Sequence, residues 1–370
     1  MHVCEAGKTM SSRLGRFLRC PLLGVLLLMC LFMILCLLMY DSSSISYLTH
    51  HFGPIRPEQR EVLILIWQWP FNQSFDLDIC KLQFNIDGCH LTVDHELYSK
   101  ADSVLIHHRD INWDLSNLPK SPRPFHQKWI WMNLESPSNT AKIPGIDNMF
   151  NVSLSYRQDS DIRMPYGWVV PTNQKLRDFI PPKKDKMVCW IVSNFQFHHR
   201  RARYYVELQR YLEIQTFGGS FNQPVSEESY REIIAGCRFY LSFENSEHND
   251  YITEKLYNAL QFGAVPIVLG PSRKNYERFI PRDAFIHVDD FPSVRDLAKY
   301  LLLLSRHEAL YCRYFNWRRY FEVKISSFPA EHACYSCDYI RQHKEYQVLT
   351  NLYWWYWGVS EGLEEPRNMF

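Results

Sequence analysis

The chain has 370 residues, of which 46% are apolar and 22% are charged, and this composition excludes a largely disordered protein. Its 41 basic and 40 acidic residues leave a net charge of +1, without the basic excess that a general nucleic-acid binder needs. Aromatic residues make up 15%, which indicates either a large aromatic core or a pocket where flat rings stack on a sugar or nucleobase.

Residues 21–40 contain no charged side chain, and as a helix they would span about 30 Å, the thickness of one bilayer core. Lys8 and three arginines precede this run, whereas the polar segment 41–51 after it has no Lys or Arg. The positive-inside rule then predicts a cytosolic tail over 1–20, a signal-anchor over 21–40 and a stem over 41–60. A cleaved signal peptide is the alternative, although the run is long for one and no small-x-small site follows it.

Seven of the 11 cysteines lie beyond this anchor, which allows at most three disulfides and leaves one thiol in an oxidising lumen. Cys334 and Cys337 form a CxxC, but no second pair follows at zinc-finger spacing, so structural disulfides are the better interpretation. The sequons at Asn72 and Asn151 are consistent with glycosylation in the lumen.

Apolar runs typical of strands buried on both faces alternate with amphipathic stretches typical of helices. This alternation predicts an α/β fold with parallel sheets. The polar, proline-bearing stretch near 170–186 predicts a break between two doubly wound domains, with a cleft between them. A glycine stop at Gly263 and an N-cap at Ser293 mark two of the helices. The predicted strands are 62–67, 103–107, 128–132, 187–192, 239–243, 265–269 and 285–288, and the predicted helices are 200–212, 253–262 and 294–304.

Polar clusters follow three of these strands, where a doubly wound sheet binds its ligands. Glu135 follows a strand directly and is a candidate general base, or else a loop carboxylate that caps the next helix. Glu254 and Lys255 begin a helix, where a diphosphate and sugar hydroxyls would bind; capping and surface ion pairs are the alternative.

Three arginines within four residues, Arg200, Arg201 and Arg203, follow the Ser193-Asn194 strand end and suit a diphosphate, although a solvated basic face fits them as well.

Two Asp-x-Asp patterns, 76–78 and 159–161, are too unspecific to predict a metal site. The sequence lacks the P-loop, dinucleotide-binding and serine-hydrolase motifs.

The block FYLSFENSEHNDYITEKLYNAL, residues 239–260, resembles the donor-site signature of the α1,3-fucosyltransferases, glycosyltransferase family 10. Further blocks similar to this family follow its order, and the resemblance covers residues 61 to 358: WQWPFNQSFD, VLIHHRDINWDLSNLP, WIWMNLESPS, SYRQDSDIRMPYG, CWIVSNF, AVPIVLGPSRKNYE and FIHVDD. It implies a GT-B fold of two Rossmann-like domains facing a cleft, on a single-pass type II anchor in the Golgi membrane. The acceptor-binding domain would be 61–178, the GDP-fucose-binding domain 179–330, and a C-terminal tail 331–370.

The resemblance also implies roles for individual residues. Glu135 matches the catalytic base, and Gln73 and Arg109 join it on the acceptor side. In this family, Trp at the position of Arg109 accompanies additional α1,4 links on type 1 chains, whereas Arg accompanies α1,3 links on type 2 chains. The donor-contacting positions are Tyr166, Ser193, Asn194, Arg201, Val225, Tyr240, Asn245, Tyr251, Glu254 and Lys255.

The family's three disulfides would be Cys80–Cys334, Cys89–Cys337 and Cys189–Cys237, with Cys312 as the free thiol. Asn72 departs from the glycine of related sequences and creates its sequon next to Gln73.

No metal or other cofactor is expected to be required, and a divalent cation would at most stimulate the activity. The implied partners are GDP-fucose, N-acetyllactosamine-type glycans on glycoproteins and glycolipids, and the Golgi membrane, but no nucleic acid; a homodimer is left open.

Two other functions remain open at this point. The first is a catalytically inactive GT-B membrane glycoprotein that binds glycans or acts as a chaperone. The second is a transferase for another nucleotide sugar on the same fold.

Overall fold

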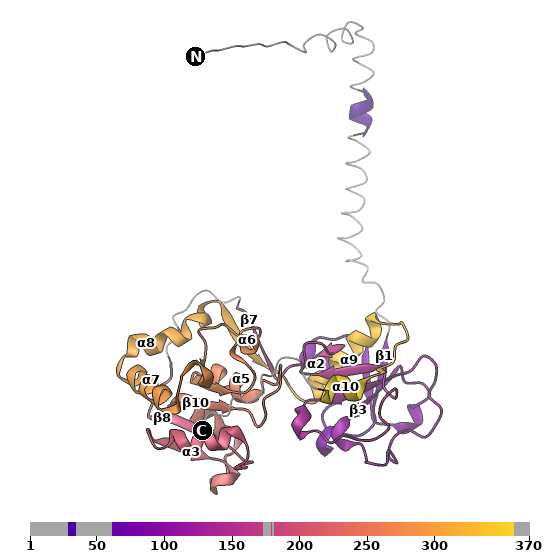
Figure 1. The fold of residues 1–370 in the computed structure, drawn as a ribbon. Coiled ribbons are helices and arrows are strands. Elements are labelled where there is room, and N and C mark those ends of the chain that lie inside the picture. Colours follow the sequence, from indigo (N-terminus) through magenta and orange to yellow (C-terminus); the bar gives the residue numbers. More distant parts are fainter. Residues whose placement is uncertain (1–28, 35–60, 173–178, 180, 359–370) are drawn as a thin grey trace, which may run out of the picture. The chain divides into compact units, whose positions relative to one another are not determined.

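The structure is a computed structural model that describes residues 29–34, 61–172, 179 and 181–358 (Figure 1). The described residues between 61 and 358 form one compact unit. Residues 29–34 are helical, while the rest of the predicted anchor, the tail over 1–20 and the stem over 41–60 lie outside the described residues. Within the described part of the chain, no helix has the length and apolarity needed to cross a membrane.

The first sheet has six strands, all paired in parallel, in the order β2-β1-β3-β4-β5-β6. Its central strands are buried on both faces, which is why the sequence shows them as continuous apolar runs. The strands are β1 (Val62–Ile66), β2 (Cys89–Thr92), β3 (Ser103–His107), β4 (Lys128–Asn133), β5 (Val152–Ser155) and β6 (Ile162–Arg163).

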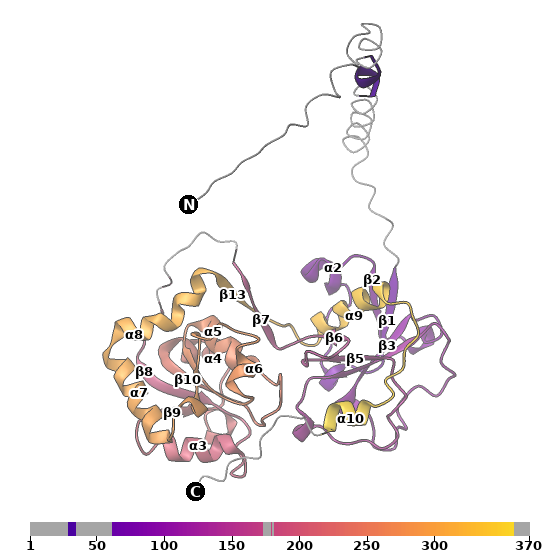
Figure 2. The same cartoon turned by 45° about the horizontal axis from the view of Figure 1, so that its top comes forward.

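Helices from the end of the chain cover the two faces of this sheet. On one face Cys334, Cys337 and Ile340 of α9 (Ala330–Gln342) pack with residues of β1, β3 and β4, and α2 (Ile79–Phe84) lies beside α9. On the other face Leu352 and Tyr356 of α10 (Leu352–Trp357) pack with the opposite side chains of the same strands. Figure 2 shows the two yellow helices on either side of the sheet. The C-terminal segment therefore completes the first α/β layer.

The second sheet has five parallel strands in the order β12-β11-β10-β8-β9, with helices on both faces. Side chains of α3, α7 and α8 share one buried cluster, and α4 and α5 contribute to clusters on the other face. The strands are β8 (Lys186–Ile191), β9 (Ile214–Phe217), β10 (Cys237–Phe243), β11 (Val265–Leu269) and β12 (Ile286–His287). The helices are α3 (Arg200–Leu208), α4 (Glu227–Gly236), α5 (Glu254–Phe262), α6 (Arg273–Tyr276), α7 (Val294–Arg306) and α8 (Glu308–Cys312).

A two-stranded antiparallel sheet pairs β7 (Gly167–Pro171) with β13 (Phe321–Ile325) and packs against α5. Gly167 permits this approach, because a Cβ there would lie 2.6 Å from Cγ of Tyr257. The strand β7 thus lies inside the range predicted for the first domain, but it packs with α5, a helix that covers the second sheet.

The predicted strands and helices are present, with ends that differ by a few residues at most, and the two parallel sheets agree with the expected α/β architecture. Gly263 ends α5 with φ 83°, and the Ser293 side chain caps α7 by accepting from the backbone N–H of Asp296. The elements that were not predicted are the strands β2, β5, β6, β7, β9 and β13 and the helices α2, α4, α6, α8, α9 and α10. The disulfides of the structure are the three implied pairs, Cys80–Cys334, Cys89–Cys337 and Cys189–Cys237, and Cys312 is a free, partly buried thiol.

Candidate active site

A cavity of about 430 Å³ lies where residues that follow β4 of the first sheet meet residues that follow β10 of the second. Carboxyl ends of parallel strands are the usual ligand sites of such sheets. One side of the cavity is mainly apolar or aromatic and the other is charged. Its lining residues are Phe71, His107, Leu134, Glu135, Tyr166, Asn245, Tyr251, Thr253, Glu254, Lys255, Ile325, Ser326 and Phe328.

Glu135 lies in this lining, two residues after the end of β4, with 26% of its side chain exposed. Its Oε2 accepts from the hydroxyl of Tyr251 at 3.4 Å, and its Oε1 lies 3.6 Å from Nη1 of Arg109. Both contacts are long and leave the carboxylate free to accept a proton from a ligand. The structure therefore places the predicted base where a ligand can reach it.

The apolar side of the cavity is organised by Asp110, which was not predicted. Its Oδ2 accepts from Nδ1 of His107 at 2.7 Å and from the backbone N–H of Phe71 at 3.2 Å. Phe71 has φ 53°, and its ring lies 5.4 Å below the guanidinium of Arg109. Arg109 therefore lies between an aromatic ring and Glu135, whereas Gln73 is exposed two residues after Phe71.

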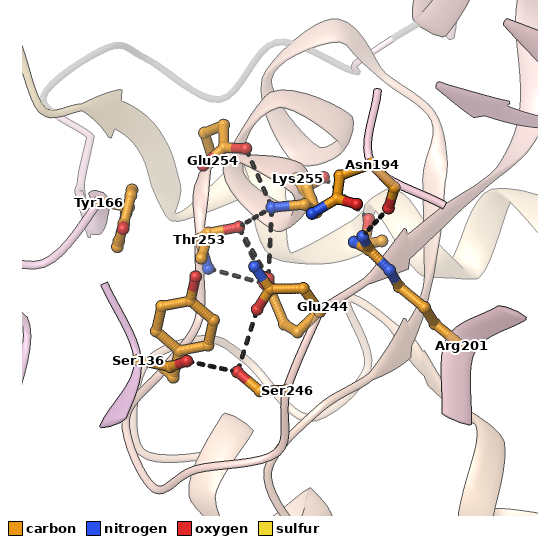
Figure 3. A network of polar contacts seen from close by, with 12 residues as sticks. Ser136, Tyr166, Asn194, Arg201, Glu244, Ser246, Thr253, Glu254 and Lys255 are labelled. Atoms are coloured by element: carbon orange, nitrogen blue, oxygen red, sulfur yellow. Dashed lines mark hydrogen bonds and ion pairs between the residues drawn. The ribbon is translucent and has the colours of Figure 1, made fainter. Parts of the chain in front are cut away.

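The charged side is built around the ammonium group of Lys255 at the start of α5 (Figure 3). Its Nζ donates to Oγ1 of Thr253 at 2.8 Å and to Oε1 of Glu254 at 3.1 Å, and it lies 3.4 Å from Oε2 of Glu244. Glu244 is buried and also accepts from the backbone N–H of Thr253 at 2.8 Å. Glu244 and Thr253 belong to the same polar cluster of strand end and helix start as Glu254 and Lys255, but the sequence assigns them no role at the site.

The pKa values of Glu244 and Lys255 are both raised, for different reasons. Burial raises the pKa of the Glu244 carboxyl. Burial also acts to lower the pKa of Lys255, but Glu244 and Glu254 outweigh it and hold the ammonium pKa above its ordinary value. Lys255 therefore stays charged at neutral pH, as a group that binds a diphosphate must.

Of the three clustered arginines, only Arg201 is buried, at 4% exposure, and its guanidinium donates to the backbone carbonyl of Asn194. Burial lowers its pKa. Arg200 instead forms ion pairs with Glu247 and Asp289, and Arg203 is exposed, so the arginines do not form one clamp. Figure 3 shows Arg201 and Asn194 on the same side of the site as Lys255.

Tyrosines and the remaining donor-side residues fall into two groups. Tyr166 and Tyr251 line the cavity together with Asn245, and the Tyr166 hydroxyl donates to the carbonyl of Leu134 at 2.5 Å. Tyr240 is fully buried in a cluster that includes Cys189, away from this lining. Ser193 and Asn194 are exposed and Val225 is half-buried, also outside the lining.

Two contacts join the loops after β4 and β10 at the cavity. The Ser246 hydroxyl donates to Oγ of Ser136 at 2.6 Å (Figure 3), and Oγ of Ser138 lies 2.6 Å from Nε2 of His248. Ser136, Ser246 and His107 stand at predicted strand ends, but the sequence assigns no site role to them or to Phe71 and Phe328, because their proximity depends on which strand ends meet.

Both Asp-x-Asp patterns have structural contacts. Asp159 pairs with Arg157 and accepts from Nε1 of Trp355, and Asp161 accepts from the backbone N–H and hydroxyl of Ser153. Asp76 accepts from the backbone N–H of Asp78. Among the described residues, no group of three His, Cys, Asp or Glu side chains is arranged to hold a metal ion.

The two sequons differ in exposure. Asn72 is exposed. Asn151 is fully buried: its amide nitrogen donates to the carbonyl of Gln347 at 2.7 Å, and its Oδ1 accepts from the backbone N–H of Trp129 at 2.8 Å. A glycan on that nitrogen would have to break these contacts, so this fold contradicts the expected glycosylation at Asn151.

Comparisons with known proteins cover nearly the whole described chain. Residues 59–167 match the family model "Fucosyltransferase, N-terminal", and residues 181–355 match "Glycosyltransferase family 10 (fucosyltransferase) C-term". The chain is 52% identical over 320 residues to 4-galactosyl-N-acetylglucosaminide 3-alpha-L-fucosyltransferase 9 of Bos taurus and 51% identical to that of Homo sapiens, covering 86% of this chain and 89% of each relative.

A more distant relative carries a different linkage in its name. The chain is 44% identical over 307 residues to 3-galactosyl-N-acetylglucosaminide 4-alpha-L-fucosyltransferase FUT3 of Pan troglodytes, covering 81% of this chain and 82% of the relative. Among solved structures, an alpha1,3-fucosyltransferase with GDP-fucose matches with a TM-score of 0.52 at 16% identity, covering 79% of this chain and 93% of that one. At that identity the likeness supports the fold alone.

Proposed function

Because the chain belongs to glycosyltransferase family 10, the fucosyltransferases, we propose that it transfers L-fucose from GDP-β-L-fucose to the 3-hydroxyl of GlcNAc in Galβ1,4GlcNAc chains. The product would be a Lewis x-type structure. The observation that carries this proposal is the position of Glu135, whose carboxylate lines the same cavity as Lys255 and Glu254.

Glu135 acts as the general base in this mechanism. The donor is β-linked and the product α-linked, so a single displacement inverts the anomeric carbon. Glu135 takes the proton of the GlcNAc 3-hydroxyl as its oxygen attacks that carbon, while the bond to GDP breaks through an oxocarbenium-like state. Arg109, Phe71 and Gln73, on the same side as Glu135, would contact the acceptor.

The leaving diphosphate gains negative charge as the bond breaks, and Lys255 provides a nearby positive charge. Arg201 adds a second cation behind Asn194. Glu254 would hold donor hydroxyls, and Asn245, Tyr166 and Tyr251 would pack against or hydrogen-bond the nucleotide sugar. With these cations in place, the reaction needs no divalent metal.

The type 2 linkage is supported by two observations. Relatives at 51–52% identity are named 4-galactosyl 3-alpha-L-fucosyltransferases, whereas the relative named for the 3-galactosyl acceptor and the 4-linkage is 44% identical. In addition, Arg109 stands at the position where the resemblance to the family associates Arg with type 2 chains. We place the enzyme in the Golgi membrane as a single-pass type II protein with a lumenal catalytic domain, on the strength of the apolar run 21–40 and its basic flank.

Product analysis tests this proposal. The purified full chain is incubated with GDP-fucose and either Galβ1,4GlcNAc or Galβ1,3GlcNAc, and the linkage of the product is determined. We expect an α1,3-fucoside on the first acceptor, little product on the second, and only a modest effect of EDTA. GDP-mannose and UDP-galactose serve as control donors. GDP release without any fucosylated product, or transfer from a control donor alone, would contradict the proposal.

A further inference from the structure

The C-terminal helix α10 contacts the loop that carries Glu135. The hydroxyl of Tyr356 donates to the backbone carbonyl of Glu135, and Nε1 of Trp357 donates to the carbonyl of Thr140 at 3.1 Å. The two donors stand next to each other on α10 and their acceptors are five residues apart on the loop. One short helix therefore binds the loop after β4 at two positions, Glu135 and Thr140.

Tyr356 is well placed to hold one conformation of this loop. Its side chain is 1% exposed, and its ring packs edge-on against Trp131 of β4 with 4.8 Å between the centroids. Burial raises the pKa of Tyr356, so the phenol remains protonated and acts as a donor at neutral pH. A buried donor of this kind can satisfy a carbonyl without competition from water.

The helix α10 is itself anchored to the first sheet. The backbone N–H of Tyr353 donates to Oδ1 of Asp147 at 2.8 Å, and Nε1 of Trp355 donates to Oδ2 of Asp159 at 3.0 Å. Residues Leu352 and Tyr356 belong to the buried cluster on that face of the sheet. Tyr356 is thus a fixed support rather than a mobile one.

The contacts of Glu135 itself are weaker than this support. Its backbone N–H donates to Oδ1 of Asn133 at 3.3 Å, and its carboxylate makes the long contacts to Tyr251 and Arg109 described above. The direction of the carboxylate therefore depends mainly on the backbone conformation at Glu135. The Tyr356 hydroxyl binds the carbonyl of that residue and so restrains this backbone.

We propose that Tyr356 is a positioning residue for the catalytic base: its hydroxyl, delivered by α10, holds the backbone of Glu135 so that the carboxylate faces the acceptor hydroxyl. This inference rests on the proposed role of Glu135. It assigns the end of the chain a direct part in the acceptor side of the active site and none in donor binding.

The test compares Tyr356→Phe with Tyr353→Phe in the full chain. The first change removes only a buried hydroxyl, while the control removes one from a residue of the same helix that is 41% exposed. Fucosyl transfer is measured per GDP-binding site, so that molecules that fail to fold do not count. We expect kcat of Tyr356→Phe to fall about 10- to 100-fold, the effect of a slightly misplaced catalytic group, with the KM for GDP-fucose and the Kd for GDP within about twofold of the parent.

A merely structural role predicts a different pattern: a lower Tm and fewer GDP-binding sites, with an unchanged kcat for those that remain. That result would overturn the inference, as would an equal loss in the Tyr353→Phe control. Trp357→Phe, which removes the donor at the other end of the loop, should reduce kcat less because Thr140 is farther from the base. A parent chain that binds GDP but transfers no fucose would overturn the proposed function, and this inference with it.

Discussion

Glu135 is the residue on which the proposed chemistry depends, and Glu135→Gln is the direct test. The amide keeps the size of the side chain and the contact with Tyr251 but cannot accept a proton. We expect transfer to fall about 10²–10⁴-fold, the usual contribution of a general base, while GDP binding stays near that of the parent. The measurement is kcat/KM together with the Kd for GDP. Glu277→Gln, a surface carboxylate paired with Arg273, is the control, and turnover within a few-fold of the parent would remove Glu135 from this role.

Lys255 and Arg201 are expected to act on the donor instead. Lys255→Ala and Arg201→Ala each remove a cation beside the proposed diphosphate site, and losing a charge-assisted contact costs roughly 1.5–3 kcal/mol. The Kd for GDP should therefore rise about 10- to 100-fold, as measured by calorimetry. Lys299→Ala, which removes an exposed lysine on α7, is the control. If both variants bind GDP as the parent does, the diphosphate lies elsewhere.

Arg109 is the residue expected to decide between acceptors. Its guanidinium is 53% exposed, with Phe71 on one side and Glu135 on the other. Arg109→Trp replaces a hydrogen-bonding group with a flat indole that can stack on a differently oriented sugar. We expect the variant to use Galβ1,3GlcNAc several-fold better than the parent while retaining activity on Galβ1,4GlcNAc. Equal parental rates on the two acceptors would contradict the assignment of Arg109 but not the transfer of fucose.

At the scale of elements, α9 places a titratable group inside the first α/β layer. His332 is 1% exposed, and burial lowers its pKa from 6.5 to about 3. As the pH falls below about 6.5, the unfolded chain binds a proton at this residue before the folded protein does. The contribution of His332 to the free energy of unfolding is therefore fully present above pH 6.5. It is lost progressively as the pH falls toward 3, by at most about 5 kcal/mol.

Urea unfolding between pH 8 and pH 4 measures this effect. The parent should lose stability steeply over that range, and His332→Gln, which does not titrate, should lose less. Burial also lowers the pKa of His108, to about 4, so His108 likewise reduces stability as the pH falls. Because His108 is present in both proteins, the difference between the two curves isolates His332. Parallel curves would show that His332 does not contribute.

At the scale of the molecule, two disulfides hold the C-terminal segment on the first sheet. Cys80–Cys334 and Cys89–Cys337 close loops of 254 and 248 residues, whereas Cys189–Cys237 closes one of 48. In a chain that keeps Cys89–Cys337, however, Cys80–Cys334 closes only about 12 further residues, so loop entropy predicts that removing it by double alanine substitution costs about 1 kcal/mol less than removing Cys189–Cys237.

Chemical denaturation of the two double variants tests this difference. As denaturant is added, we also expect the Cys80/Cys334 variant to lose transfer activity at a lower concentration than GDP binding. The reason is that α10 contacts the Glu135 loop, whereas Lys255 lies on α5 beside the second sheet. A larger loss of stability without Cys80–Cys334 would show that native contacts, and not loop entropy, set the order.

Much of the second sheet could be predicted from the sequence because the signals there are local. A continuous apolar run is enough to indicate a strand buried on both faces, and Gly263 and Ser293 mark helix ends through backbone and capping chemistry within a few residues. The site residues Glu135, Glu254 and Lys255 could be proposed for the same reason, since each stands at a strand end or a helix start.

The implied disulfides tie the C-terminal tail to the first domain, but only the tertiary structure decided how its helices complete the first layer and the site. The pairing of β7 with β13 joins residues about 150 positions apart, and α9 and α10 cover a sheet that ends more than 160 residues earlier. Burial of Asn151 and the contact of Tyr356 with Glu135 arise only from that docking. No local pattern encodes such contacts, because they depend on the shape and apolar surface of a partner that is distant in the chain.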